Sequence, residues 1–189
     1  MATKLTTGKV RFSYAHIFEA VAPQGGGDPK YSVTLLIPKA DTATLAKIKE
    51  AMKEARDNFC QRNGANAIPV NFNHTLHDGD GMRDSGEPYG PECKGCYVIT
   101  VSSKQKPLVI DNMKNEIVDP AEVYSGCYGR AAINFYGYSR QGKKGLSAGL
   151  QSIQKLHDGE ALGGARGSAD DFADDFKDED DDLLGDAPF

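Results

Sequence analysis

Hydrophobic and polar residues alternate in several short segments of the chain, and this pattern predicts β-strands. In residues 9–14, Val10, Phe12 and Tyr14 share one face. Lys9 and Arg11 share the other face. Successive residues of a strand point to opposite faces, so such alternation is typical of a half-buried strand. Further strands are predicted over residues 30–38, 95–104, 108–111, 127–140 and 146–155.

Residues 41–59 instead show the spacing of an amphipathic helix. Apolar residues recur there at intervals of three and four, namely Leu45, Ile48, Met52, Ala55 and Phe59. Asp41 or Thr42 can cap the start of this helix, and Gly64 ends the pattern. A polar stretch over residues 63–94 follows, and loops of this length inside a compact domain are usually functional or mobile.

These elements together predict a mainly β fold with one or two helices. Several short strands around one clear helix, without alternating strand and helix units, favour an OB-fold-like five-stranded barrel with extended loops. Residues 1–157 are predicted to form this domain, residues 158–169 a Gly-rich linker, and residues 170–189 a disordered acidic C-terminal tail.

The charge of the chain is divided between the predicted domain and the tail. Residues 170–186 hold ten acidic residues and one basic residue, Lys177, out of totals of 27 acidic and 22 basic residues. The formal net charge of −5 therefore combines a body of about +4 with a tail of about −9. A mildly basic domain with a polyanionic tail indicates that the domain binds a polyanion and that the tail competes for the same surface.

The predicted strand over residues 127–140 carries the clearest binding chemistry. Its odd positions are small or apolar and suit a packed interior; they are Cys127, Gly129, Ala131, Ile133, Phe135, Gly137 and Ser139. Its even positions place three tyrosines and two arginines on the opposite face; they are Tyr128, Arg130, Ala132, Asn134, Tyr136, Tyr138 and Arg140. Exposed bases stack on aromatic side chains while Arg and Lys meet phosphates, so this face predicts a single-strand nucleic-acid surface.

Neighbouring basic residues extend that surface. Lys143 and Lys144 prolong it past the end of the strand, and Lys9 and Arg11 can continue it. The alternative is that tyrosine lies on the wet face of the sheet because it suits strands, with the arginines paired to nearby carboxylates.

The polar stretch contains residues that could bind metals. His74, His77, Cys93 and Cys96 offer two nitrogen and two sulfur ligands for zinc, although free cysteines and exposed histidines are favoured here. Asp78, Asp80 and Asp84 form a carboxylate cluster without the EF-hand spacing. No phosphate-binding loop with a Lys-Ser/Thr ending is present. We therefore expect no cofactor and no metal, and zinc at the first four residues stays an open alternative.

Several body segments resemble phage-encoded single-stranded-DNA-binding proteins of the OB-fold type. These segments span residues 30–39, 78–80, 124–136 and 150–164. The tip, Asp186-Ala187-Pro188-Phe189, is similar to the end of bacterial single-stranded-DNA-binding proteins. That likeness implies that Phe189 and its carboxylate enter a pocket on partner enzymes while upstream acids meet a basic rim. The implied partner-binding residues are Asp180, Asp181, Asp182, Asp186, Pro188 and Phe189.

The sequence thus predicts a non-catalytic protein that coats single-stranded DNA in phage replication, recombination or repair and recruits enzymes through its tail. No apolar stretch approaches the roughly 20 residues of a membrane span, so we expect the host cytoplasm and no membrane partner; a homo-oligomer is possible. Two alternatives are a metal-dependent nuclease that uses the loop over residues 74–96 and a protein-only hub whose tail imitates DNA.

Overall fold

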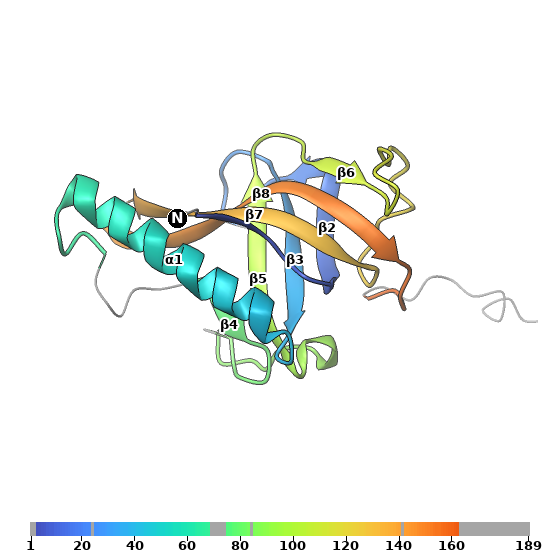
Figure 1. The fold of residues 1–189 in the computed structure, drawn as a ribbon, viewed down its shortest axis with the longest axis horizontal. Helices are drawn as coiled ribbons and strands as arrows, with labels where there is room; N and C mark the ends of the chain where they lie inside the picture. Colours follow the sequence, from blue (N-terminus) through green and yellow to red (C-terminus); the bar gives the residue numbers. More distant parts are fainter. Residues whose placement is uncertain (1–2, 24, 69–74, 84, 141, 163–189) are drawn as a thin grey trace, which may run out of the picture.

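The computed structural model describes residues 3–23, 25–68, 75–83, 85–140 and 142–162 (Figure 1). The first half contains β1 (Lys4–Thr6), β2 (Val10–Val21), β3 (Lys30–Pro38), α1 (Thr42–Asn63) and β4 (Leu76–Asp78). The second half contains the 3-10 turn η1 (Pro91–Cys93), β5 (Cys96–Ser103), β6 (Leu108–Ile110), β7 (Tyr128–Arg140) and β8 (Lys143–His157). The predicted mainly β fold with a helix after the second predicted strand is confirmed.

Five strands close into a ring. Starting from β7, the hydrogen-bonded neighbours are β2, β3, β5 and β8, and β8 pairs with β7 again. All of these pairings are antiparallel except the short contact of β5 with β8. The short strands β1 and β6 lie at the edges, and β4 pairs with β5. The ring matches the five strands expected for an OB-fold-like domain.

Buried residues from the ring strands and from α1 fill one core. The largest fully buried side chains include Phe12, Leu35, Ile99, Ile133 and Phe135. The helix adds its predicted stripe, in which Leu45, Ile48, Met52 and Ala55 are buried and Phe59 is partly buried against the core. Each fully buried residue of this kind contributes roughly 1.5–3 kcal/mol, so the stripe fixes α1 against the ring.

The ends of α1 follow the predicted signals. The Asp41 carboxylate accepts a hydrogen bond from the Thr44 amide at 3.1 Å, which caps the first turn. The helix extends four residues beyond Phe59, to Asn63. Gly64 ends it with φ at 108°, a conformation that favours glycine. The amide of Gly64 donates to the carbonyl of Cys60.

Strand β2 is longer than the alternation of residues 9–14 predicts. The register with β3 shifts between Ser13 and His16, and Tyr14 has a positive φ of 46°. This irregularity interrupts the two-residue period, so the continuation to Val21 leaves no simple pattern in the sequence. Strand β8 also begins earlier than predicted, at Lys143, because the turn after β7 is short.

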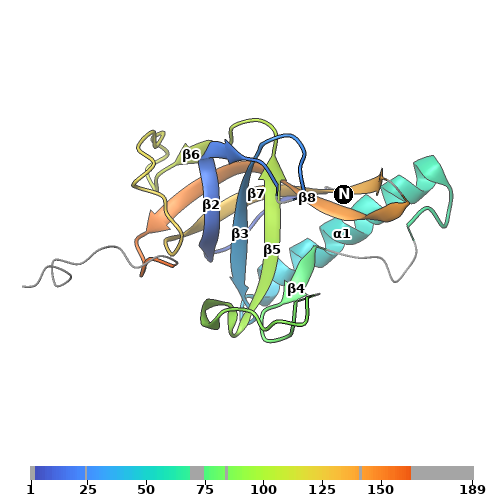
Figure 2. The same cartoon turned by 180° about the vertical axis from the view of Figure 1, so that it is seen from behind.

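The far end of the β7–β8 hairpin projects beyond the ring together with α1, as both ribbon views show (Figures 1 and 2). Among the described helices, none has the length and apolar character needed to cross a membrane. Residues 158–162, which composition assigns to a linker, pack on the body: the Leu162 amide donates to the Ser125 carbonyl at 2.8 Å. The predicted partner-binding residues of the tail lie outside the described residues.

Candidate nucleic-acid interface

Strand β7 has the two faces that its sequence predicts. Gly129, Ala131, Ile133 and Phe135 are buried, whereas the intervening even positions are exposed or half-buried. Ser139 departs from this pattern, since it lies near the hairpin tip, where both faces meet solvent. The predicted facing of the strand is therefore confirmed over its length inside the ring.

The first residues of the outward face are held by contacts within the fold. The ring of Tyr128 stacks on His157 with 4.7 Å between centroids. The charged groups of Lys9 and Arg11 lie 5.8 and 5.5 Å from the Tyr128 centroid. Arg11 also donates to the Gly126 carbonyl at 3.1 Å and to the Glu160 carbonyl at 2.6 Å.

The middle of the face is likewise engaged. Arg130 donates through Nε to the Thr7 carbonyl at 2.9 Å, and Asn134 accepts a hydrogen bond from Gln151 at 3.0 Å. These contacts give Arg130 and Asn134 partners within the domain. They fasten the N-terminal segment and β8 to β7.

The remaining predicted residues lie on the projecting half of the β7–β8 hairpin, which we call the arm (residues 136–140 and 142–146). Tyr136 is 44% exposed, Tyr138 is half-buried, and Arg140, Lys143 and Lys144 are exposed. The arm rests on α1 through Gly137, where a Cβ atom would collide with the ring of Phe59. The predicted surface is thus divided into two parts. The side chains of one part have partners within the ring of five strands, and those of the other part lie on the arm.

A second candidate surface lies on the outer face of β2, β3 and β5, which Figure 2 shows from the front. Ser13, Thr34 and Thr100 stand side by side on these three strands, and the hydroxyls of Thr34 and Thr100 lie 3.1 Å apart. Together with Leu36 and Val98 they line a pocket of about 330 Å³. We call this pocket the groove.

Aromatic and basic side chains form the walls of the groove. Tyr14 is 59% exposed at the irregularity of β2. The Arg83 guanidinium lies 5.2 Å from the centroid of Tyr89, and both residues line the pocket with His77 and Cys93. Aromatic rings and an arginine are the groups on which bases stack and which meet phosphates in proteins that bind single-stranded nucleic acids.

Sequence reasoning missed Tyr14, Arg83 and Tyr89 as site residues. Arg83 and Tyr89 belong to the polar stretch, whose length does indicate function, but no periodicity assigns either residue to a face. The alternation of residues 9–14 places Tyr14 on the face of Val10 and Phe12, and the irregularity of β2 turns it outward instead.

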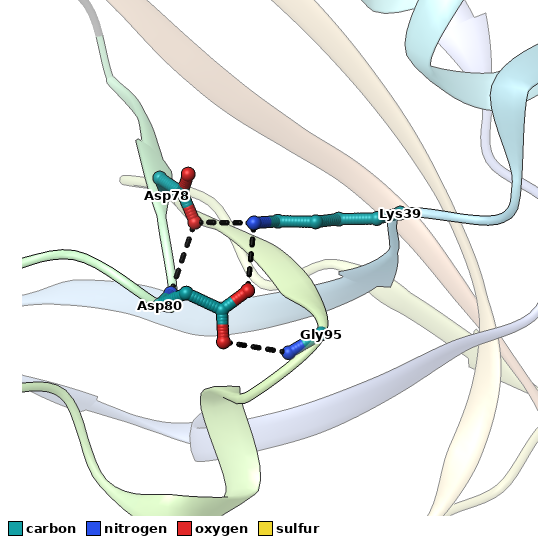
Figure 3. Close-up of polar contacts among 4 residues, drawn as sticks. All are labelled: Lys39, Asp78, Asp80 and Gly95. Carbon is teal, nitrogen blue, oxygen red and sulfur yellow. Dashed lines mark hydrogen bonds and ion pairs between the residues drawn. The ribbon is translucent and has the colours of Figure 1, made fainter.

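The loop that carries Arg83 and Tyr89 is fastened at its base by three charged residues (Figure 3). Lys39 Nζ lies 2.7 Å from a carboxylate oxygen of Asp78 and 2.7 Å from one of Asp80. Asp80 also accepts a hydrogen bond from the Gly95 amide at 3.1 Å. The hydrogen bonds from Lys39 hold the pKa values of both carboxyls below their ordinary range, and the two carboxylates raise the pKa of Lys39.

These contacts bear on the metal hypotheses. The carboxylates of Asp78 and Asp80 face a lysine ammonium, which competes with any cation. Cys93 is buried with Leu36 and Val98, and burial raises the pKa values of the Cys93 and Cys96 thiols, which disfavours the thiolate that zinc binds. Within the described ranges, no three His, Cys, Asp or Glu residues converge as metal ligands; His74 and Asp84 lie outside those ranges.

Comparison with known proteins identifies related chains. A family described as "Enterobacter phage Enc34, ssDNA-binding protein" matches residues 3–184. A putative protein p50 of Acyrthosiphon pisum secondary endosymbiont phage 1 is 34% identical over 167 residues, which cover 85% of this chain and 87% of the relative.

Solved structures are similar as well. The single-stranded-DNA-binding protein of bacteriophage Enc34, in complex with ssDNA, aligns with a TM-score of 0.73 and 29% identity over 85% of this chain and 90% of that one. Gp2.5, a single-stranded-DNA-binding protein of bacteriophage T7, aligns with a TM-score of 0.59 over 95% and 97% of the two chains. Its identity of 16% supports the fold alone.

Proposed function

The chain belongs to the family of phage single-stranded-DNA-binding proteins described for Enterobacter phage Enc34, and on that premise we propose that it binds single-stranded DNA through the groove. Proteins of this class are not enzymes, in agreement with the expectation from the sequence. The observation that carries the proposal is the convergence of Tyr14, Tyr89 and Arg83 over a hydroxyl-lined floor.

The groove suits binding with little dependence on base sequence. Every base can stack on Tyr14, and a base can also stack on Tyr89 when the Arg83 guanidinium moves from the Tyr89 ring to a phosphate. The hydroxyls of Ser13 and Thr100 donate or accept hydrogen bonds by rotation, so they accommodate any base edge. We infer that the arm extends the track, with Tyr136 and Tyr138 as additional stacking platforms and Arg140, Lys143 and Lys144 as phosphate contacts.

The acidic tail has two proposed roles. The first is competition with DNA for the groove, and the path of residues 158–162 supports it. Arg11 holds the Glu160 carbonyl. Leu162 packs against Leu36, Cys93 and Val98, which also line the groove. Leu162, the last described residue, therefore lies beside the groove, and a tether that leaves from this point would give the acids of the tail a high effective concentration there.

The second proposed role is recruitment of replication, recombination or repair enzymes in the host cytoplasm through Pro188 and Phe189. Deletion of residues 168–189 should tighten DNA binding, most strongly at low salt. Removal of Phe189 alone should leave DNA affinity unchanged and abolish enzyme capture in pull-downs from infected cells. Weaker DNA binding after the deletion, or full capture without Phe189, contradicts the respective role.

Titration with oligo(dT) tests the groove itself. Tyr89→Ala should lose one stack, or roughly 1–3 kcal/mol of binding free energy, whereas Tyr89→Phe keeps the ring and should bind nearly as tightly as the parent. Thermal unfolding of both variants checks that the domain is folded. Equal affinities for a folded Tyr89→Ala variant and the parent protein would remove Tyr89 from the site.

A further inference from the structure

We propose that Lys39, Asp78 and Asp80 act as positioning residues for DNA binding, because they latch the loop over residues 79–95 and so fix one wall of the groove. The inference rests on the proposed function of the groove. It assigns these three charged residues to the affinity of the site without requiring that any of them touch DNA.

The latch joins three elements at one point (Figure 3). Lys39 follows the end of β3, Asp78 ends β4, and Gly95 precedes β5. Besides its two ion pairs, Lys39 donates its backbone amide to the Gly95 carbonyl at 2.9 Å. Asp80 accepts from the Gly95 amide, so a single carboxylate connects the lysine to the far end of the loop.

Backbone segments from the two ends of the loop also approach each other closely at its base. The Gly79 amide donates to the Cys96 carbonyl at 2.9 Å. A Cβ atom at position 79 would collide with the carbonyl oxygens of Cys93 and Cys96, so only glycine permits this approach. The two ends of the loop therefore meet at Lys39.

The outer part of the loop is a small unit of its own. The Arg83 amide donates to the Glu87 carbonyl at 2.8 Å, and the Gly86 amide donates to the Arg83 carbonyl at 2.8 Å. A bridge between Met82 and Pro88 completes this turn. These contacts stay within the loop. Besides the packing of Cys93 and Tyr89 on Leu36 and Val98, the position of Arg83 over the groove depends on how the base of the loop is held.

The latch is partly open to water, which separates its effect on binding from its effect on folding. The side chain of Lys39 is 34% exposed, and those of Asp78 and Asp80 are 51% and 45% exposed. Ion pairs of this exposure contribute little to global stability. Variants of the latch should therefore fold, while the loop loses its fixed position.

Charge provides a sharp test. Asp80→Ala removes one negative charge, and so does Glu50→Ala on the exposed surface of α1. General attraction to phosphates should make both variants bind DNA slightly more tightly. The latch predicts the opposite for Asp80→Ala: its affinity for oligo(dT) should fall by about fivefold or more, comparable with the weaker cases of one lost base stack.

A second pair of variants tests the lysine. Lys39→Met should weaken binding well beyond Lys49→Met, which removes an equivalent charge from an exposed position on α1. Lys39→Arg should restore affinity, because a guanidinium can bind both carboxylates. Trypsin cleavage after Arg83 should be faster in Asp80→Ala and Lys39→Met than in the parent protein, since the loop is released.

The outcomes distinguish the latch from the groove. If Tyr89→Ala weakens binding while Asp80→Ala behaves as Glu50→Ala does, the groove stands and the latch is wrong. If Tyr14→Ala combined with Tyr89→Ala has no effect, the groove itself is wrong. Unchanged cleavage after Arg83 in both latch variants would also overturn the inference.

Discussion

The groove and strand β7 present similar side chains in different ways. On β7, tyrosines and arginines alternate with buried apolar residues along one continuous segment. In the groove, Tyr14 comes from β2 whereas Arg83 and Tyr89 come from a loop about seventy residues away in sequence. The β7 pattern is visible in the sequence, yet its first residues have partners within the fold. The groove leaves no pattern in the sequence, yet Tyr14 and Arg83 in its walls are exposed. An alternation of polar and apolar residues therefore predicts a strand more securely than it predicts a binding site.

The largest expected difference between the two regions concerns stacking. Tyr14→Ala combined with Tyr89→Ala should cost about 2–6 kcal/mol of single-strand binding, since two stacks are lost. Tyr136→Ala combined with Tyr138→Ala should cost less, because the groove gathers its tyrosines with Arg83 and the hydroxyl floor at one place, whereas the arm only extends the proposed track. Fluorescence titration with oligo(dT) measures both. A larger loss in the arm variant than in the groove variant would reverse their proposed ranking.

The next effect concerns the stability of the domain at two glycines that lie against neighbouring atoms. Gly79→Ala places a methyl group against backbone carbonyls, whereas Gly137→Ala meets the Cβ, Cγ and Cδ2 atoms of Phe59, a partly buried side chain near the end of α1. We expect Gly79→Ala to destabilise the domain by about 1–3 kcal/mol, typical of overpacking, and Gly137→Ala by less. Denaturant unfolding measures both values, and the reverse order would show that the base of the loop is more adaptable than its contacts indicate.

A smaller effect is expected from charge on the arm. Lys143→Ala combined with Lys144→Ala should reduce the slope of log affinity against log salt by about 0.7 for each phosphate that is no longer neutralised. The decrease in affinity should be similar for oligonucleotides of any sequence. A salt dependence that matches the parent protein would remove the two lysines from the DNA track.

The smallest effect concerns pH and the latch. The lowered pKa values of Asp78 and Asp80 mean that their contribution to stability is complete above the ordinary carboxyl pKa of about 4 and is lost as the pH falls through the lowered values. The raised pKa of Lys39 keeps the latch charged throughout the neutral range. The difference in Tm between the parent protein and Asp80→Ala should therefore be constant from about pH 5 to 9 and shrink below about pH 4. A decline already between about pH 5 and 7 would contradict this assignment.

Much of the fold could be predicted because it depends on local periodicity. The stripe of Leu45, Ile48 and Met52 identifies α1, and the alternation of residues 127–140 identifies β7. The candidate site was harder to predict from the sequence, since Tyr14 turns outward only through an irregularity in β2. Asp78 and Asp80 look like possible metal ligands in the sequence, which gives no sign that Lys39, about forty residues earlier, meets them.

The central claim is that the groove on β2, β3 and β5 holds single-stranded DNA. Photo-crosslinking of the full-length protein to oligo(dT), followed by mass spectrometry of the peptides, tests it most directly. We expect crosslinks at Tyr14 and Tyr89, with weaker ones at Tyr136. Crosslinks confined to residues 128–144, with none at Tyr14 or in the loop over residues 79–95, would contradict it.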